Sequence, residues 1–318
     1  MRIERSLNRL NRTPGMVTGY LHHSYAESLA ALGEPCILPE SGGWILKRRI
    51  PGFSYYDAMG CYPLFTCQDW SHLHADLQEI GSGLVSLAMV TDPFGEYDPA
   101  YLRQCFKDVV IAYKEHFVVD LSRFNNSSAS SRHRSYARKA LKEIRIERCE
   151  RPAEHVDEWT RLYDMLIARH GIRGFSAFSR EALDRQLRVP GIVAFRAIYK
   201  EITVGMTLWY TQGDLGYYHL GAYSDIGYQL RASYGLFQSA IEYFAAGRLR
   251  RLDLGAGAGV SGSDKDGLSQ FKRGWSTETR TAYFCGRIFD RERYSEMVKA
   301  KAISETDYFP AYREGEFA

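Results

Sequence analysis

Short apolar runs bounded by Gly, Pro and Asp mark the first half of the chain. Their length and boundaries predict strands at 36–39, 43–50 and 83–90. Between them, residues 70–80 and 97–106 carry apolar side chains at helical spacing, which predicts two short helices. Residues 108–122 alternate between apolar and polar positions, as in one strand or a bent strand pair.

A strongly patterned helix is predicted after the polar loop at 125–131, which can supply an N-cap. It covers 132–147, RHRSYARKALKEIRIE, with Ala137, Leu141 and Ile144 on an apolar face. Another face is basic and consists of Arg134, Arg138 and Lys142 at i, i+4 steps. The pattern breaks at CERPAEH, so we expect a domain boundary near residue 150, with domains at 1–150 and 151–318.

The second half has a clearer periodicity. It predicts helices at 154–170 and 179–187, followed by strands at 192–199, 202–211 and 215–222. The short turns between these strands, KEI and QGD, suit antiparallel hairpins. The remaining elements are a helix at 231–247, a strand at 250–255, a short helix at 266–273, a strand at 279–289 and a helix from 290. This order predicts an α+β fold with mixed, largely antiparallel sheets flanked by helices.

Composition narrows the range of functions. The 318 residues are 45% hydrophobic and 25% charged, enough for two cores of ordinary size. A net charge of +3 is too small to predict nucleic-acid binding over the whole surface, and we expect no DNA partner. The basic N-terminus lacks an apolar signal region, and no run of about 18 apolar residues occurs. We therefore expect a soluble, cytoplasmic protein without a membrane span.

The six cysteines show no CxxC spacing, and the nine histidines form no HExxH or HxH pattern. We expect free thiols in a reducing compartment and no metal. The sequence also contains no GxSxG nucleophile elbow.

A glycine-rich segment, LDLGAGAG at 252–259, resembles the first motif of S-adenosylmethionine-dependent methyltransferases. That motif normally opens a doubly wound parallel sheet. Here turn residues follow it, and only about 60 residues remain. A methyltransferase is therefore kept as an alternative that requires the strand at 251–254 to lie within a parallel sheet.

Three segments together resemble the Fem-type and related GNAT acyltransferases: YYHLGAYSD (217–225), AIEYFAAGRLRRLDLG (240–255) and DGLSQFKRGW (266–275). In the first half, YYDAMGCYP (55–63) resembles the tyrosine-rich loop of this family, and SRHRSYARKALKE (131–143) resembles its basic helix. The phosphate loop of GNAT enzymes is only loosely matched by QLRASYG (229–235).

The resemblance implies two GNAT-like domains and the transfer of an acyl group to an amine. It implies acyl-CoA, such as acetyl-CoA, or aminoacyl-tRNA as the donor. The implied acceptors are amino sugars, nucleotide-linked sugars or other precursors of the cell envelope or of exopolysaccharide. A GNAT-like binding module without catalysis is a further alternative.

Acyl transfer to an amine requires an oxyanion stabiliser and a proton route, but no covalent nucleophile. Lys272 lies in the segment that matches the family best and is the candidate for a fixed positive charge; alone, it would be interpreted as a solvated helix lysine. Asp253 ends a strand, where it could accept a proton, orient the amine or cap a turn. Asp266 is expected to cap the helix that bears Lys272.

The candidate cofactor-binding residues are Arg231, Tyr234 and Gly235, at the start of a helix whose free N–H groups attract anions. His219 could be a base, although a single strand histidine is usually structural. The candidate substrate-binding residues are Tyr56, Asp57, Tyr62, Arg134, Arg138 and Phe271.

Overall fold

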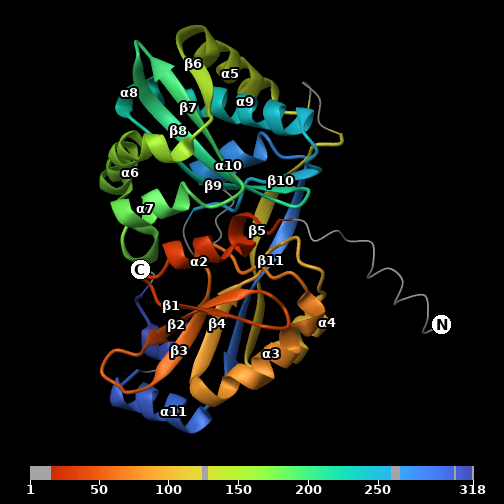
Figure 1. Ribbon diagram of the computed structural model, residues 1–318, viewed down its shortest axis with the longest axis vertical. Helices are drawn as coiled ribbons and strands as arrows, with labels where there is room; N and C mark the ends of the chain where they lie inside the picture. The colour runs from red at the N-terminus through yellow and green to blue at the C-terminus, as the bar shows by residue number, and fades with distance from the viewer. Residues whose placement is uncertain (1–15, 124–127, 259–265, 304–305, 317–318) are drawn as a thin grey trace, which may run out of the picture.

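The structure is a computed structural model that describes residues 16–123, 128–258, 266–303 and 306–316. Its strands form one continuous sheet in the order β1-β2-β3-β4-β11-β5-β10-β9-β8-β7-β6 (Figure 1). Most neighbours in this sheet are antiparallel; of the described strand pairs, only β3/β4 and β10/β9 are parallel. The α+β prediction with a largely antiparallel sheet is confirmed.

One half of the sheet is built by the first part of the chain (Figure 1). Its strands are β1 (Glu34–Ile37), β2 (Trp44–Arg49), β3 (Tyr56–Gly60), β4 (Ser86–Val90) and β5 (Val109–Asp120). The helices of this part are α2 (His23–Ser28), α3 (Leu73–Glu79) and α4 (Pro99–Cys105), with 3-10 turns at Gly19–Leu21, Trp70–His72 and Ile80–Gly83.

The other half contains the predicted meander of β7 (Ile192–Tyr199), β8 (Ile202–Gln212) and β9 (Leu215–Tyr223). It is completed by β6 (Arg145–Cys149) at the edge and by β10 (Arg251–Asp253). Its helices are α5 (Ser131–Glu143), α6 (Val156–His170), α7 (Arg180–Gln186), α8 (Asp225–Gln229), α9 (Ala232–Ala246) and α10 (Gly267–Arg273). Short 3-10 turns lie at Pro152–His155 and Gly174–Ser176.

Two long strands join the halves. The strand β5 pairs with β10 at its C-terminal end and with β11 (Glu278–Ile288) along its length, and β11 continues to pair with β4. Helix α11 (Arg291–Ala300) and the turn Ala311–Arg313 then pack on the first half (Figure 1). The last strand of the chain thus returns to the half where the chain began.

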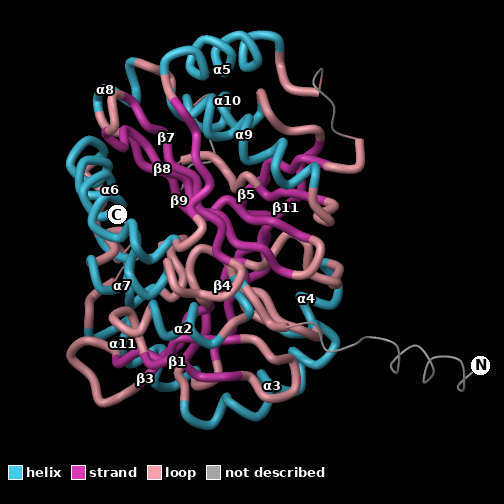
Figure 2. The backbone as a smooth tube through the Cα atoms, turned by 45° about the horizontal axis from the view of Figure 1, so that its top comes forward, coloured by secondary structure: helices cyan, strands magenta, loops and turns pink. Residues whose placement is uncertain are grey.

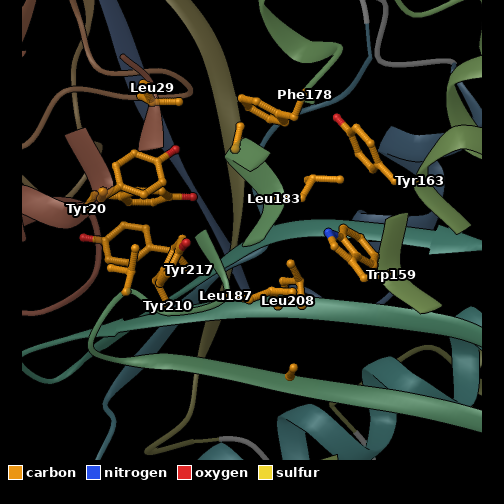
Figure 3. Close-up of a cluster of buried hydrophobic side chains, with 14 of the residues drawn as sticks. Tyr20, Leu29, Trp159, Tyr163, Phe178, Leu183, Leu187, Leu208, Tyr210 and Tyr217 are labelled. Carbon is orange, nitrogen blue, oxygen red and sulfur yellow. The ribbon is translucent and has the colours of Figure 1, made fainter. Parts of the chain in front are cut away.

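Helices cover both faces of the second half of the sheet (Figure 2). Helices α5 and α9 pack on one face, around buried Trp209, Phe237 and Trp275. On the other face, α6 and α7 pack together with α2 of the first half, around an aromatic cluster that includes Tyr20, Tyr210 and Tyr217 (Figure 3). This aromatic cluster ties the two halves together by burying large apolar surface between them.

Several local expectations were wrong. The predicted helix 132–147 ends at Glu143, and the alternating segment Arg145–Cys149 pairs with β7 as an edge strand instead. Leu141, expected on the buried face, is 39% exposed, whereas Ala137 and Ile144 are buried. The segment 55–63 was expected to be a loop, but Tyr56–Gly60 forms strand β3, inserted between β2 and β4.

The expected division into 1–150 and 151–318 stays a prediction. In the described sheet, α5 and β6 lie with the second half although they precede residue 150, and β11 lies partly with the first half. Strand β10 is central but lies between one parallel and one antiparallel neighbour. That arrangement differs from the doubly wound parallel sheet that the methyltransferase alternative requires.

Among the described helices, none is both long enough and apolar enough to cross a bilayer.

Candidate active site

The two parallel strands β9 and β10 run side by side for only a short distance. Arg251–Asp253 pairs with residues 215–217, after which β9 continues to Tyr223 while β10 ends. The chain after Asp253 therefore leaves the sheet at its centre, between the two halves. Residues 254–258 and helix α10 lie at this point, and both catalytic residues predicted from the sequence, Lys272 and Asp253, are found here.

Lys272 is a buried lysine, not a solvated one, since only 5% of it is exposed. Its Nζ donates to the carbonyl oxygen of Ala256 at 2.7 Å and lies 5.4 Å from the ring centre of Tyr218. Burial lowers its pKa from 10.5 to about 8, and the nearby carboxylate of Asp253 acts in the opposite direction. Near neutral pH the site therefore holds a mostly protonated ammonium group with a fixed position.

Gly255 and Gly257 allow the chain after β10 to approach α10 closely. Gly255 has a φ of +75°, and a Cβ there would lie 3.0 Å from Nζ of Lys272. At Gly257 a Cβ would lie 2.0 Å from Oγ of Ser269 on α10. The glycines therefore serve close packing between this loop and α10.

Asp253 faces β5 and makes two hydrogen bonds. Its Oδ1 accepts from the backbone N–H of Gly255 at 2.7 Å, and its Oδ2 lies 2.8 Å from Nδ1 of His116. The register explains this contact: Asp253 lies opposite Val118, and His116, two residues earlier on β5, projects from the same face. Both Asp253 and His116 are buried.

Helix α10 is held at both ends. At its N-terminus, Oδ1 of Asp266 accepts from the N–H groups of Leu268 and Ser269, so the expected capping role of Asp266 is confirmed. At its C-terminal end, Nε2 of His133 on α5 lies 2.9 Å from the carbonyl oxygen of Phe271.

Phe271 and Trp275 lie in the core between α5, α9 and the sheet. Phe271 contacts the rings of Tyr234 and Phe237. It stands next to Lys272 in the chain, so this packing fixes the helix that presents the ammonium. Its expected contact with substrate stays a prediction.

The three residues predicted to bind a cofactor lie around the start of α9. Arg231 precedes the helix with a φ of +56°, and its guanidinium lies 4.5 Å from the ring centre of Tyr136 on α5. Tyr234 packs against His133 and Tyr136. Gly235 is buried, and its Cα faces α5, where a Cβ would lie 3.4 Å from a methyl group of Leu141. Gly235 thus allows α5 and α9 to approach closely; contact with a ligand stays a prediction.

The structure does not bring Tyr56, Asp57 and Tyr62 together as one platform. Asp57 is fully buried and accepts from Nε and Nη2 of Arg313, at 2.6 and 2.8 Å. Tyr56, its neighbour on β3, is 41% exposed, because successive strand residues face opposite sides. Tyr62 lies beyond the strand, with its ring beside that of Phe178. The carboxylate of Asp57 has the environment of a structural ion pair.

Of the two basic residues predicted to bind substrate on α5, Arg138 is exposed and Arg134 is half-buried. Arg134 donates from Nη1 to the carbonyl oxygen of Ala129. Arg138 makes no hydrogen bond or ion pair with the described residues after Asp253.

His219 has the structural role that a single strand histidine usually has. It contacts the hydroxyl of Tyr20 and the side-chain amide of Gln186, each at 3.1 Å. Burial lowers its pKa to about 3, so the ring is neutral and lies within the aromatic cluster.

Two polar residues near the site were not identified from the sequence. One is His116; the other is Asp92, which follows β4 and accepts a hydrogen bond from the hydroxyl of Tyr217 at 2.8 Å. Burial raises the pKa of Asp92 to about 6. The only sequence signal for His116 was its position on an alternating strand, since its partner Asp253 lies 137 residues further along the chain.

Comparison with known families gives one match: residues 127–273 match the acetyltransferase (GNAT) domain family. No curated protein matches the chain.

Solved structures share the fold at low sequence identity. The crystal structure of FemX superposes with a TM-score of 0.62 at 14% identity, covering 86% of this chain and 92% of that one. The C-terminal domain (DUF2156) of a lysylphosphatidylglycerol synthetase from Agrobacterium fabrum gives 0.58 at 16% identity, covering 86% and 91%. L-PGS from Bacillus licheniformis gives 0.54 at 15% identity, covering 91% and 99%. The chain therefore has the Fem-type GNAT fold, and its residues 127–273 are similar to the acetyltransferase (GNAT) domain family.

Proposed function

We propose that this protein is an N-acyltransferase that moves an acyl group from acyl-CoA or aminoacyl-tRNA to the amine of an amino sugar or a related cell-envelope or exopolysaccharide precursor. The observation that carries the proposal is the buried ammonium of Lys272, fixed where β10 ends between the two halves of the sheet. Burying a lysine removes the hydration of its ammonium and costs free energy, which favours a functional role for Lys272.

The chemistry suits a fixed cation. When the acceptor amine attacks the carbonyl carbon of the donor, a C–N bond forms and the carbonyl oxygen becomes negatively charged. The C–S bond of a thioester, or the C–O bond of an aminoacyl ester, then breaks, and the leaving group takes a proton. A preorganised positive charge in a water-poor site stabilises the charged intermediate, typically by about 10²- to 10³-fold in rate. We assign that role to Lys272.

The donor is proposed to lie along the start of α9. Helix N-termini attract phosphate through free N–H groups and the helix dipole, and Arg231 adds a positive charge at this end. Nearby on α5, Arg138 and Lys142 are exposed. This basic surface suits the phosphates of CoA and equally those of a tRNA acceptor stem.

The acceptor class is proposed from the resemblance and from the solved structures that share the fold. One of these is assigned to a lysylphosphatidylglycerol synthetase, whose product carries an aminoacyl group on a lipid headgroup. Acceptors of the cell envelope are therefore tested first.

Ligand binding tests the proposal. Thermal-shift measurements would use acetyl-CoA, palmitoyl-CoA, S-adenosylmethionine, UDP-glucosamine and bulk aminoacyl-tRNA. We expect stabilisation by an acyl-CoA or by aminoacyl-tRNA. Stabilisation by S-adenosylmethionine alone would contradict the proposal and favour the methyltransferase alternative.

A further inference from the structure

We propose that His116 is the general base of this site and that Asp253 is the positioning residue that orients it. The inference rests on the proposed acyl transfer and deepens it, because it names the group that takes the proton from the acceptor amine.

Hydrogen bonding leaves one nitrogen of His116 available. Nδ1 lies 2.8 Å from Oδ2 of Asp253. An ionised carboxylate can only accept, so Nδ1 carries the proton and donates it, and the lone pair of the neutral ring lies on Nε2. Within the described part of the chain, Nε2 has no hydrogen-bond partner, and this atom is not fully buried. The side chain is 11% exposed, so a small group can reach it.

Asp253 is itself held in place. Its Oδ1 accepts from the N–H of Gly255, while its backbone belongs to β10 between β5 and β9. The carboxylate is thus fixed from two directions and orients the imidazole by its second oxygen. This geometry matches the base-plus-orienter arrangement of hydrolytic and acyl-transfer sites, in which the carboxylate selects the tautomer of the histidine.

The dyad lies next to the proposed cation. The charge of Asp253 acts on the pKa of Lys272. Gly255 lies between these two residues: its N–H donates to Asp253, and its Cα approaches Nζ of Lys272. Lys114, which shares a face of β5 with His116, also acts electrostatically on Lys272, so we place the attacking amine on the β5 side of a carbonyl bound at Nζ. The proton passes from the amine nitrogen to Nε2 as the C–N bond forms, and the resulting imidazolium returns it to the leaving thiolate or alkoxide.

Other charged groups lie around the dyad. Arg280 on β11 lies opposite His116 in the register and is paired with Glu278. Lys114 precedes His116 on the same face of β5. Asp253 also interacts electrostatically with Asp92, Tyr20 and Tyr217, and Asp266 acts on Lys272.

The test compares wild type with H116A, H116Q and D253N, using whichever donor and acceptor from the panel above the wild type turns over. Initial rates would be measured from pH 6 to 9. The active form has a neutral His116 and a protonated Lys272, so the wild-type rate should rise with pH and fall again above about pH 8, where Lys272 loses its proton. H116Q should lower kcat by about 10²- to 10⁴-fold and abolish that rise. Added imidazole should partly restore H116A.

D253N keeps the imidazole but removes the carboxylate that orients it and selects its tautomer. The maximal rate should therefore fall, while the rise with pH should remain because the imidazole is still present. The matched control is H72Q, which changes a half-exposed histidine of the first half that lies outside the site. Wild-type activity with an unchanged pH profile in H116Q would overturn the inference.

A second measurement separates this inference from the proposed function. Diethylpyrocarbonate carbethoxylates accessible neutral imidazoles, and mass spectrometry locates the label. We expect His116 to be labelled in the folded wild type. If no donor is turned over, the proposed function fails. If His116 is labelled only after unfolding, Nε2 is unreachable and the general-base role is refuted, whatever the activity.

Discussion

The burial of Lys272 should appear as a pH-dependent term in stability. The folded protein holds this lysine with a pKa of about 8, against 10.5 in the unfolded chain. Between these values the unfolded state binds more protons, so stability increases as pH rises. From pH 7 to 9.5, the two pKa values correspond to a gain of about 2 kcal/mol from this one group. K272M, which keeps the length of the side chain but cannot titrate, should lack that gain.

The assay is urea unfolding followed by tryptophan fluorescence, at both pH values and constant ionic strength. The quantity of interest is the free energy of unfolding of wild type minus that of K272M. This difference should be about 2 kcal/mol larger at pH 9.5 than at pH 7. The matched control is K142M, which removes an exposed lysine of α5. A K272M difference that does not change with pH, or changes only as K142M does, would refute the account of a buried ammonium.

Three further predictions concern the residues around the site. D57N breaks the buried pair with Arg313 and should lower the free energy of unfolding by about 3–5 kcal/mol in urea titrations; a normal midpoint with a raised KM would instead indicate substrate binding. G274A places a Cβ 2.1 Å from the ring of His133 and should cost about 1–3 kcal/mol, less in the double variant with H133A; additive costs would argue against the clash. Folding lowers the pKa of His219 from 6.5 to about 3, so between pH 7 and 5 this histidine lowers the free energy of unfolding of the wild type by about 2 kcal/mol. H219Q should lack that loss; an equal fall in both proteins would contradict this.

Elements with strong local periodicity were predictable from the sequence. The meander of β7, β8 and β9 and the helices α6, α7 and α9 lie within a few residues of their predicted bounds. In these segments local hydrophobic pattern and tertiary packing agree. The location of Lys272 on a capped helix beside the glycine segment was also predictable from spacing.

Long-range pairing was not predictable in the same way. Nothing in the periodicity of residues 278–288 indicates that β11 pairs with β4 of the first half, because pairing partners are set by the whole fold. For the same reason the contact of His116 with Asp253 could not be read from either segment alone. The strand β3 was missed because Tyr56–Gly60 is short and lies between turn residues, and its stability comes from β2 and β4.

The central claim is that the buried ammonium at the end of β10 promotes acyl transfer to an amine. The most direct measurement is the initial rate of amide formation from the donor and acceptor that the panel identifies, for wild type, K272M and K299M at pH 7.5; Lys299 is an exposed lysine of α11. We expect kcat of K272M to fall by about 10²- to 10³-fold, with K299M close to wild type. A K272M protein that folds and transfers the acyl group at the wild-type rate would contradict the claim.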